Sequence, residues 1–185
     1  MKKWVRVAAF AIAIVLAVLG INATRMGSRQ IDVPGNDETA PSIEASAQRL
    51  AQAVRFRTVS HQDASQFPVA EFDRFQAFLS ETYPHIESTL KKRRVGQHSL
   101  LYQWPGTDTS LQPILLMAHQ DVVPIDPVSA QMWTHGPFGG EIAEGFIWGR
   151  GTLDDKGAVM ALHEAAETLA SLPGHSGVDG LRPGK

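Results

Sequence analysis

The sequence contains no cysteine, so disulfide bonds and thiolate metal sites are excluded. Any bound metal ion must therefore be held by histidine and carboxylate side chains. An excess of charge of either sign is also missing, because 17 basic residues face 19 acidic ones for a formal net charge of -2. We therefore expect no nucleic-acid partner. The short basic run at residues 91–94 has no interleaved aromatic residues and predicts a solvated turn or strand edge.

A long apolar run is present at the N-terminus. Residues 7–21 carry no charge and follow Lys2, Lys3 and Arg6. A membrane-spanning helix needs about 20 apolar residues and a signal-peptide core about 7–15, so residues 1–24 fit a signal anchor or a signal peptide. Ala23 offers a poor cleavage site, which favours the anchor, with the cations on the cytoplasmic side. The protein is thus expected to be membrane-anchored or secreted, with its domain on the extracytoplasmic side.

The rest of the chain has the composition of a globular domain, with 43% hydrophobic and 19% charged residues overall. Residues 25–41 are polar and contain prolines, and they are predicted to form a linker. Apolar spacing predicts helices at residues 43–54, 69–83 and 156–172, the first capped by Ser42 and the second stopped by Pro84. Strands are predicted at residues 99–104 and 145–149.

Residues 114–118 form a short apolar run without polar alternation. Such a run is typical of a strand that is covered on both faces of a mostly parallel sheet. The expected fold class is therefore α/β, a mostly parallel sheet with helices on both faces.

Two ionisable residues follow this predicted strand. His119 and Asp121 are two positions apart, so both side chains point to one side, at the strand end where α/β sheets bind ligands. A zinc-binding imidazole commonly donates its second ring nitrogen to a carboxylate. Asp121 is a candidate for that carboxylate or for a residue that orients a base. The pattern is weak by itself, and a structural or surface pair is the alternative.

Two further acids, Asp154 and Asp155, stand at the start of the predicted helix 156–172. Gly149 and Gly151 precede them and allow a tight bend. The ordinary interpretation of such acids is a helix cap and a first-turn charge that the helix dipole favours. We prefer this interpretation for Asp155 and a functional role for Asp154.

Four motifs in order, HQDVVP, WTHGPFGG, GFIWGRG and TLDDKG, lie at residues 119–124, 133–140, 145–151 and 152–157. Together they resemble the co-catalytic zinc peptidase family that contains carboxypeptidase S, aminoacylase and succinyl-diaminopimelate desuccinylase, above all its carboxypeptidase S-like, N-acyl-amino-acid hydrolase branch. The resemblance runs from about Ile43 to Leu172. Residues 42–172 are therefore expected to be the N-terminal part of the catalytic domain.

The resemblance implies hydrolysis of an amide or peptide bond by metal-activated water, with a peptide or N-acyl amino acid as substrate. It implies that His119 binds the first zinc ion, that Asp121 is the catalytic carboxylate beside it, and that Asp154 bridges two zinc ions. Two neighbouring cations repel unless an anion lies between them, which explains the bridging carboxylate. Asp155 matches a position that is not a ligand.

The family's general-base glutamate and its later metal ligands have no counterpart here, since Glu164 and Glu167 do not match the expected pair of adjacent glutamates. Residues 173–185 are expected to be an irregular tail, such as a frameshift would produce. Catalytic zinc normally needs three protein ligands, so we expect this fragment to be inactive by itself. A membrane-anchored remnant without activity and a binding module are the alternatives. The oligomeric state is open.

Overall fold

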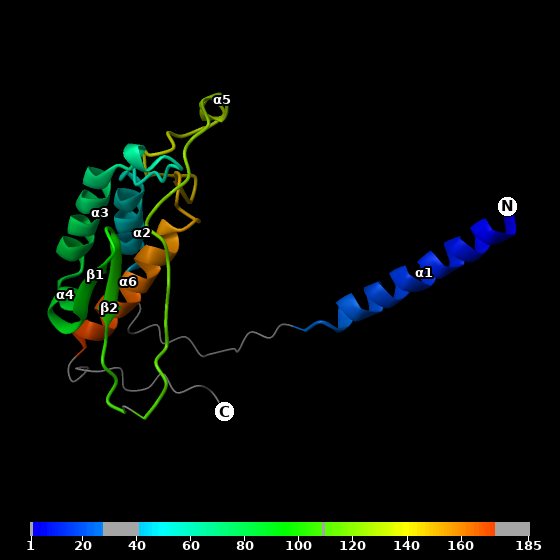
Figure 1. Cartoon of the computed structure of the whole chain (residues 1–185), viewed down its shortest axis with the longest axis horizontal. Helices are drawn as coiled ribbons and strands as arrows, with labels where there is room; N and C mark the ends of the chain where they lie inside the picture. Colours follow the sequence, from blue (N-terminus) through cyan, green and yellow to red (C-terminus); the bar gives the residue numbers. More distant parts are fainter. Residues whose placement is uncertain (1, 28–40, 109, 173–185) are drawn as a thin grey trace. The chain divides into compact units, whose positions relative to one another are not determined.

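The computed structural model describes residues 2–27, 41–108 and 110–172, in two units that are considered separately. The first unit contains helix α1, Lys2–Arg25 (Figure 1). Its stretch Lys3–Arg25 has a mean hydropathy of 2.4 and is long and apolar enough to cross a membrane. The predicted linker falls mostly outside the described residues, and the predicted tail falls entirely outside them.

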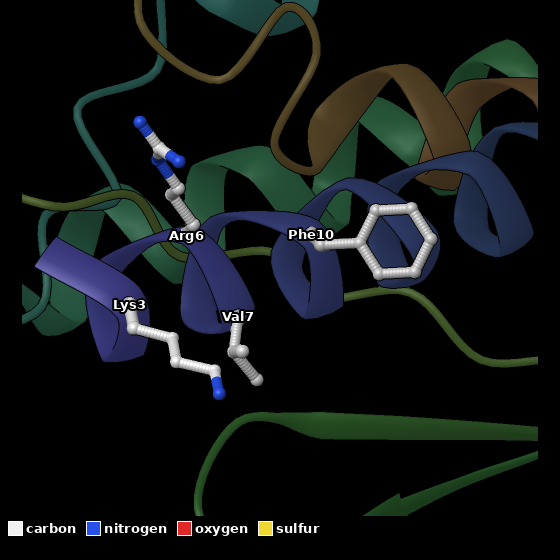
Figure 2. A pocket seen from close by; sticks show the side chains of 4 residues that line it. All are labelled: Lys3, Arg6, Val7 and Phe10. Carbon is white, nitrogen blue, oxygen red and sulfur yellow. The ribbon is translucent and has the colours of Figure 1, made fainter.

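The first turns of α1 combine cationic and apolar side chains. Lys3, Arg6, Val7 and Phe10 project from them and line a shallow hollow (Figure 2). A single helix forms this hollow, so it is open surface and not an enclosed cavity. Cations directly before an apolar helix are typical of the cytoplasmic end of a membrane span.

The second unit begins with two helices whose ends follow the predicted signals. Helix α2, Ile43–Val54, starts at Ser42, whose hydroxyl accepts the Ala45 N–H at 3.4 Å. Helix α3, Val69–Thr82, buries the predicted face that includes Phe72, Phe75 and Leu79. Both predictions are confirmed. A short 3-10 helix, η2 (Ala64–Gln66), lies between them.

Pro84 ends α3, as predicted, but it also begins a further helix. Helix α4, Pro84–Thr89, has the proline in its first turn, where a missing N–H costs no helical hydrogen bond. The next two N–H groups, of His85 and Ile86, donate to the Glu167 carboxylate at 3.0 and 2.9 Å. Glu167 lies on α6, Lys156–Ser171, so this contact fixes α4 against α6.

The core lies where α6 packs against α2 and α4, with α3 beside them (Figure 1). Its buried members are Ala53, Phe75, Leu79, Tyr83, Ile86, Val159 and Met160. The core also encloses the carboxylate of Glu164, which is 7% exposed. Arg49 and Tyr83 both donate hydrogen bonds to this carboxylate, so the buried charge is paired.

The described strands form two antiparallel hairpins. Strand β1, Lys91–Val95, pairs with β2, Ser99–Gln103, and contains the basic run predicted as a turn or strand edge. Strand β3, Glu141–Ala143, pairs with β4, Phe146–Trp148. A short helix, α5 (Pro127–Ala130), precedes the second hairpin.

The predicted mostly parallel sheet with helices on both faces is not formed by the described residues, and the buried strand predicted at residues 114–118 is not confirmed by this structure. These residues belong to no strand, and Ile114 to Met117 are 62%, 69%, 65% and 78% exposed. A strand needs hydrogen-bonded neighbouring strands, and no described strand pairs with this segment. One parallel bridge, Val59 to Val122, forms just after it. The unit is thus a mixture of helices and small antiparallel sheets.

Candidate metal centre

The structure brings His119, Asp121 and Asp154 together. The Nε2 atom of His119 lies 2.8 Å from Oδ1 of Asp154. Its Nδ1 atom lies 3.1 Å from Oδ1 of Asp121 and 3.0 Å from the Asp121 carbonyl oxygen. The imidazole therefore uses one ring nitrogen for each aspartate, and the two-residue spacing places Asp121 on the side of the ring that faces away from Asp154.

The carboxylates favour a positive charge at this position. Partial burial acts to lower the pKa of His119, but the hydrogen bond with Asp154 and the contacts with Asp121 and Asp155 act the other way and prevail. The pKa of His119 is therefore raised above its ordinary value. The neighbouring carboxylates thus stabilise the protonated form of the His119 imidazole.

The donor set fits part of a metal site. An imidazole whose second nitrogen is held by a carboxylate is the usual arrangement of a metal-binding histidine. Nε2 of His119 and the carboxylate of Asp154, whose side chain is 89% exposed, face each other in open solvent. Within the described ranges, no group of three or more histidine, aspartate and glutamate side chains is placed to hold one ion. These ranges thus offer two donors and one orienting carboxylate.

Asp154 reaches this place through the turn after β4. Gly149 and Gly151 have φ values of 153° and 91°, and the Thr152 hydroxyl donates to the Gly149 carbonyl at 2.9 Å. A Cβ at Gly151 would lie 2.7 Å from Cγ1 of Val122. The turn therefore lies directly against the chain that follows His119 and Asp121, and only glycine fits there without strain.

Lys156 holds the start of α6 in place and was missed by the sequence analysis. Its ammonium is fully buried and donates to the carbonyl oxygens of Ala53 and Phe56 at 3.0 and 2.5 Å. Burial lowers the pKa of Lys156 to about 8, against the opposing charge of Glu71. The lysine ties the turn that carries Asp154 to the end of α2. Its position on the apolar face of the helix, three residues before Val159, was the available signal.

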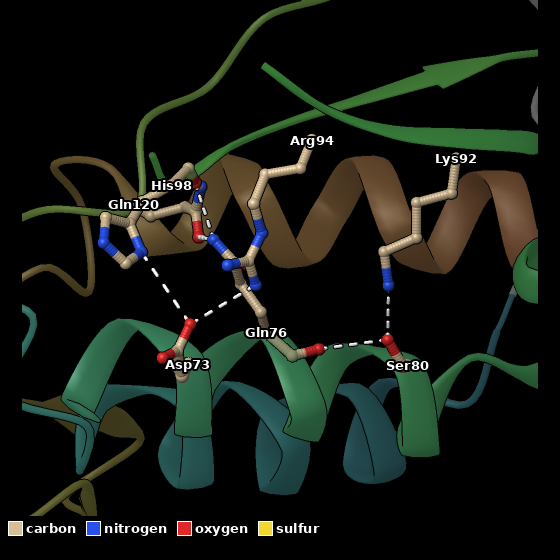
Figure 3. Close-up of polar contacts among 7 residues, drawn as sticks. All are labelled: Asp73, Gln76, Ser80, Lys92, Arg94, His98 and Gln120. Atoms are coloured by element: carbon tan, nitrogen blue, oxygen red, sulfur yellow. Dashed lines mark hydrogen bonds and ion pairs between the residues drawn. The ribbon is translucent and has the colours of Figure 1, made fainter. Parts of the chain in front are cut away.

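Gln120, which lies between His119 and Asp121 in the sequence, makes polar contacts with His98 and Gln76 (Figure 3). Its amide donates to the His98 carbonyl at 2.8 Å and accepts from Nε2 of Gln76 at 3.1 Å. Gln76 lies on α3, is 4% exposed, and also donates to the His98 carbonyl at 2.6 Å. The site is therefore connected by the side-chain amides of Gln120 and Gln76 to α3 and to the β1–β2 hairpin.

The backbone of the same segment is held by the chain at residues 58–60. The Thr58 hydroxyl donates to the Gln120 carbonyl at 2.6 Å. The Val122 N–H donates to the Thr58 carbonyl at 2.9 Å, and the Ser60 N–H donates to the Val122 carbonyl at 3.0 Å. These bonds form the parallel bridge and continue the extended chain past Asp121.

Comparison with known proteins gives a family match over the site. Residues 115–177 match the peptidase family M20/M25/M40. The chain is 42% identical over 166 residues to probable carboxypeptidase S-like 2 of Dictyostelium discoideum. This alignment covers 85% of this chain and 31% of that protein. It is 37% identical over 149 residues to carboxypeptidase S of Saccharomyces cerevisiae, with 76% and 24% covered.

A third relative is the human N-fatty-acyl-amino acid synthase/hydrolase PM20D1, 40% identical over 129 residues, with 68% of this chain and 24% of that protein covered. The chain thus spans about a third or less of the length of the curated relatives it matches. Carboxypeptidases and an N-acyl-amino-acid hydrolase are both among these relatives. Residues 115–177, with His119, Asp121 and Asp154, are thus similar in sequence to the peptidase family M20/M25/M40.

Proposed function

We propose that this chain carries part of the active site of a zinc-dependent hydrolase of amide or peptide bonds, of the carboxypeptidase or N-acyl-amino-acid amidohydrolase type. The observation that carries the proposal is the placement of the His119 ring, with Nε2 facing Asp154 and Nδ1 held by Asp121. It stands in the segment that matches this peptidase family. In the proposed site His119 and Asp154 would hold zinc.

When bound, zinc supplies Lewis-acid activation of a water molecule and of the scissile carbonyl group. The residues of this chain then have distinct tasks. Asp121 accepts the Nδ1–H of His119, which selects the tautomer whose Nε2 lone pair faces the ion. Asp154 would supply an anionic oxygen ligand. The remaining ligands and the general base are proposed to come from outside the described residues. We expect residues 1–185 alone to hydrolyse no substrate, because two donors hold zinc weakly.

The relatives support a substrate class. The names of carboxypeptidase S and of the N-fatty-acyl-amino acid synthase/hydrolase both describe reactions at an amide bond next to an amino acid. We propose a peptide or an N-acyl amino acid as the substrate of this site.

We further propose that residues 114–118 form a strand of a parallel sheet in the complete catalytic domain, to which residues 42–172 contribute. The apolar side chains of Ile114 to Met117 are exposed here, and such a stretch is stable only when covered. The parallel bridge between Val59 and Val122 has the orientation that such a sheet requires.

Hydrolysis is tested in a chimera in which residues 42–172 replace the corresponding segment of yeast carboxypeptidase S. We expect the chimera to hydrolyse a peptide or N-acyl amino acid substrate. Loss of a residue that orients a metal ligand costs at most about 100-fold in activity. His119→Ala removes a proposed zinc ligand itself, so it is expected to lower kcat/KM by more than about 100-fold. Asp121→Asn is expected to lower it about 10–100-fold.

His61→Ala serves as the control, because His61 is an exposed histidine away from the motifs. Its kcat/KM is expected to stay within about twofold of the chimera's, as is usual for surface substitutions. A folded, zinc-loaded chimera without hydrolysis would contradict the proposal and favour a binding or remnant role.

We also propose that α1 anchors the protein in a membrane, with the Lys3 and Arg6 end in the cytoplasm. The full chain is expected to stay in the membrane pellet after alkaline carbonate extraction, because an apolar helix of this length inserts stably. N-terminal sequencing of the product provides the check on processing. Release into the supernatant with a new N-terminus near Ala23 would show a cleaved signal peptide instead.

A further inference from the structure

Asp155 is the N-cap residue of α6, yet its side chain makes no hydrogen bond to that helix. The N-cap residues Ser42 and Asp126 behave in the usual way, because their side chains accept N–H groups of their own helices. Capping is thus the ordinary use of such a side chain, and Asp155 has a different partner.

That partner is the backbone of His119. Oδ2 of Asp155 accepts the His119 N–H at 3.1 Å, across 36 positions of sequence. The neighbouring Asp154 contacts the His119 ring at Nε2. The two aspartates therefore hold the same histidine at two points, one at its backbone and one at its ring.

This second contact has a specific effect because the chain before His119 has little other support. Residues 114–118 pair with no described strand, so the His119 N–H lacks a ladder partner there. A metal site requires its ligands to be held within about 0.5 Å of their working positions. The Asp155 carboxylate fixes the backbone of one proposed ligand relative to the turn that carries the other.

We propose that Asp155 is a positioning residue that sets the distance between the ligands His119 and Asp154 without binding metal itself. This inference rests on the proposed function. It differs from the simpler role of a first-turn acid that stabilises α6 through the helix dipole, because that role involves no contact with His119.

The experiment uses the full, isotope-labelled chain in detergent micelles with three substitutions at this position. Asp155→Asn keeps an oxygen that accepts the His119 N–H. Asp155→Ala removes it, and Asp155→Ser supplies a hydroxyl that can cap α6 but is too short to reach His119. Asp126→Ala is the matched control, since it removes the N-cap of the exposed helix α5, where Asp126 accepts the Val128 N–H at 2.6 Å.

Two quantities are measured by NMR: hydrogen exchange of the His119 amide, and the apparent Kd for Zn²⁺ from the His119 ring signals. For the Ala and Ser variants we expect amide exchange to be about fivefold or more faster, as for the loss of one hydrogen bond. Their Kd is expected to rise about 10–100-fold. Asp155→Asn and Asp126→Ala are expected to leave both quantities within about threefold, the scatter usual for such contributions.

Unchanged amide exchange in folded Asp155→Ser or Asp155→Ala would overturn the positioning role. If Asp155→Asn speeds amide exchange and raises the Kd as much as Asp155→Ala does, the positioning role is also overturned. The charge of Asp155, and not its contact with the His119 N–H, would then cause the effect. If Zn²⁺ leaves the His119 ring of the unsubstituted chain unaffected, the proposed function fails, while amide exchange still decides the role of Asp155.

Discussion

Gly140→Ala is expected to lower the free energy of unfolding by about 2–5 kcal/mol. This is the sum of the cost of a left-handed backbone at a residue other than glycine and the cost of an overpacked contact. Gly140 has a φ of 55°, and a Cβ there would overlap the carbonyl oxygen of Ala51 in α2. Neither backbone can shift without separating the β3–β4 hairpin from α2. Urea denaturation of the full chain, followed by tryptophan fluorescence, measures the loss.

Gly96→Ala separates the two causes. Gly96 has a similar φ of 62°, but a Cβ there meets no atom within 4 Å. Its substitution is expected to cost only the backbone strain, about 1 kcal/mol. Equal losses at Gly96 and Gly140 would show that α2 and the hairpin are not in close contact.

Glu164→Leu is expected to cost about 3 kcal/mol of unfolding free energy, the lower end for breaking a buried ion pair. Arg49 donates to Glu164 through Nε and Nη2 at 2.5 and 2.6 Å, and the Tyr83 hydroxyl donates at 2.8 Å. The substitution removes the acceptor of the Tyr83 hydroxyl and leaves the Arg49 guanidinium with only the Ser46 hydroxyl, at 3.5 Å. The lower end applies because the Arg49 side chain is 29% exposed and gains some water.

The same cluster predicts a dependence of stability on pH. Burial acts to raise the pKa of Glu164, but hydrogen bonds from Arg49 and Tyr83 outweigh it, and the pKa falls below its ordinary value of 4.5. Below about pH 4.5 the folded state therefore binds fewer protons than the unfolded state. The contribution of Glu164 to stability is fully present above about pH 4.5 and is lost as the pH falls through the lowered pKa.

Denaturation midpoints measured at several pH values check both expectations. The unsubstituted chain is expected to lose stability more steeply below about pH 4.5 than Glu164→Leu, because the variant lacks this titrating group. Glu164→Gln, which keeps one acceptor oxygen, is expected to fall between them in stability at neutral pH. Parallel pH curves for the unsubstituted and Leu chains would contradict the account of the cluster.

Local features explain which parts of the fold were predictable. The helices α2, α3 and α6 follow from apolar spacing and from nearby residues such as Ser42 and Pro84. The strand at residues 114–118 is predicted from a short apolar run without polar alternation, but strand pairing depends on neighbours that no local pattern specifies. In this structure no described strand pairs with these residues, and Ile114 to Met117 are exposed.

The site shows the same division. His119, Asp121 and Asp154 were found from motif spacing and resemblance, and the structure brings them together. Asp155 was interpreted as a cap, since a cap is the local use of an acid at a helix start, whereas its partner lies 36 positions away. The buried ammonium of Lys156 was likewise not predicted, because its acceptors, Ala53 and Phe56, are distant in sequence.

The most direct test of the central claim is a Zn²⁺ titration of the full chain, followed through the ring nitrogens of its seven histidines by NMR. If His119 and Asp154 are ligands, Nε2 of His119 shifts on titration, Nδ1 stays protonated against Asp121, and His119→Ala abolishes the response. A response at another histidine, or one that persists in His119→Ala, would contradict the assignment of this site.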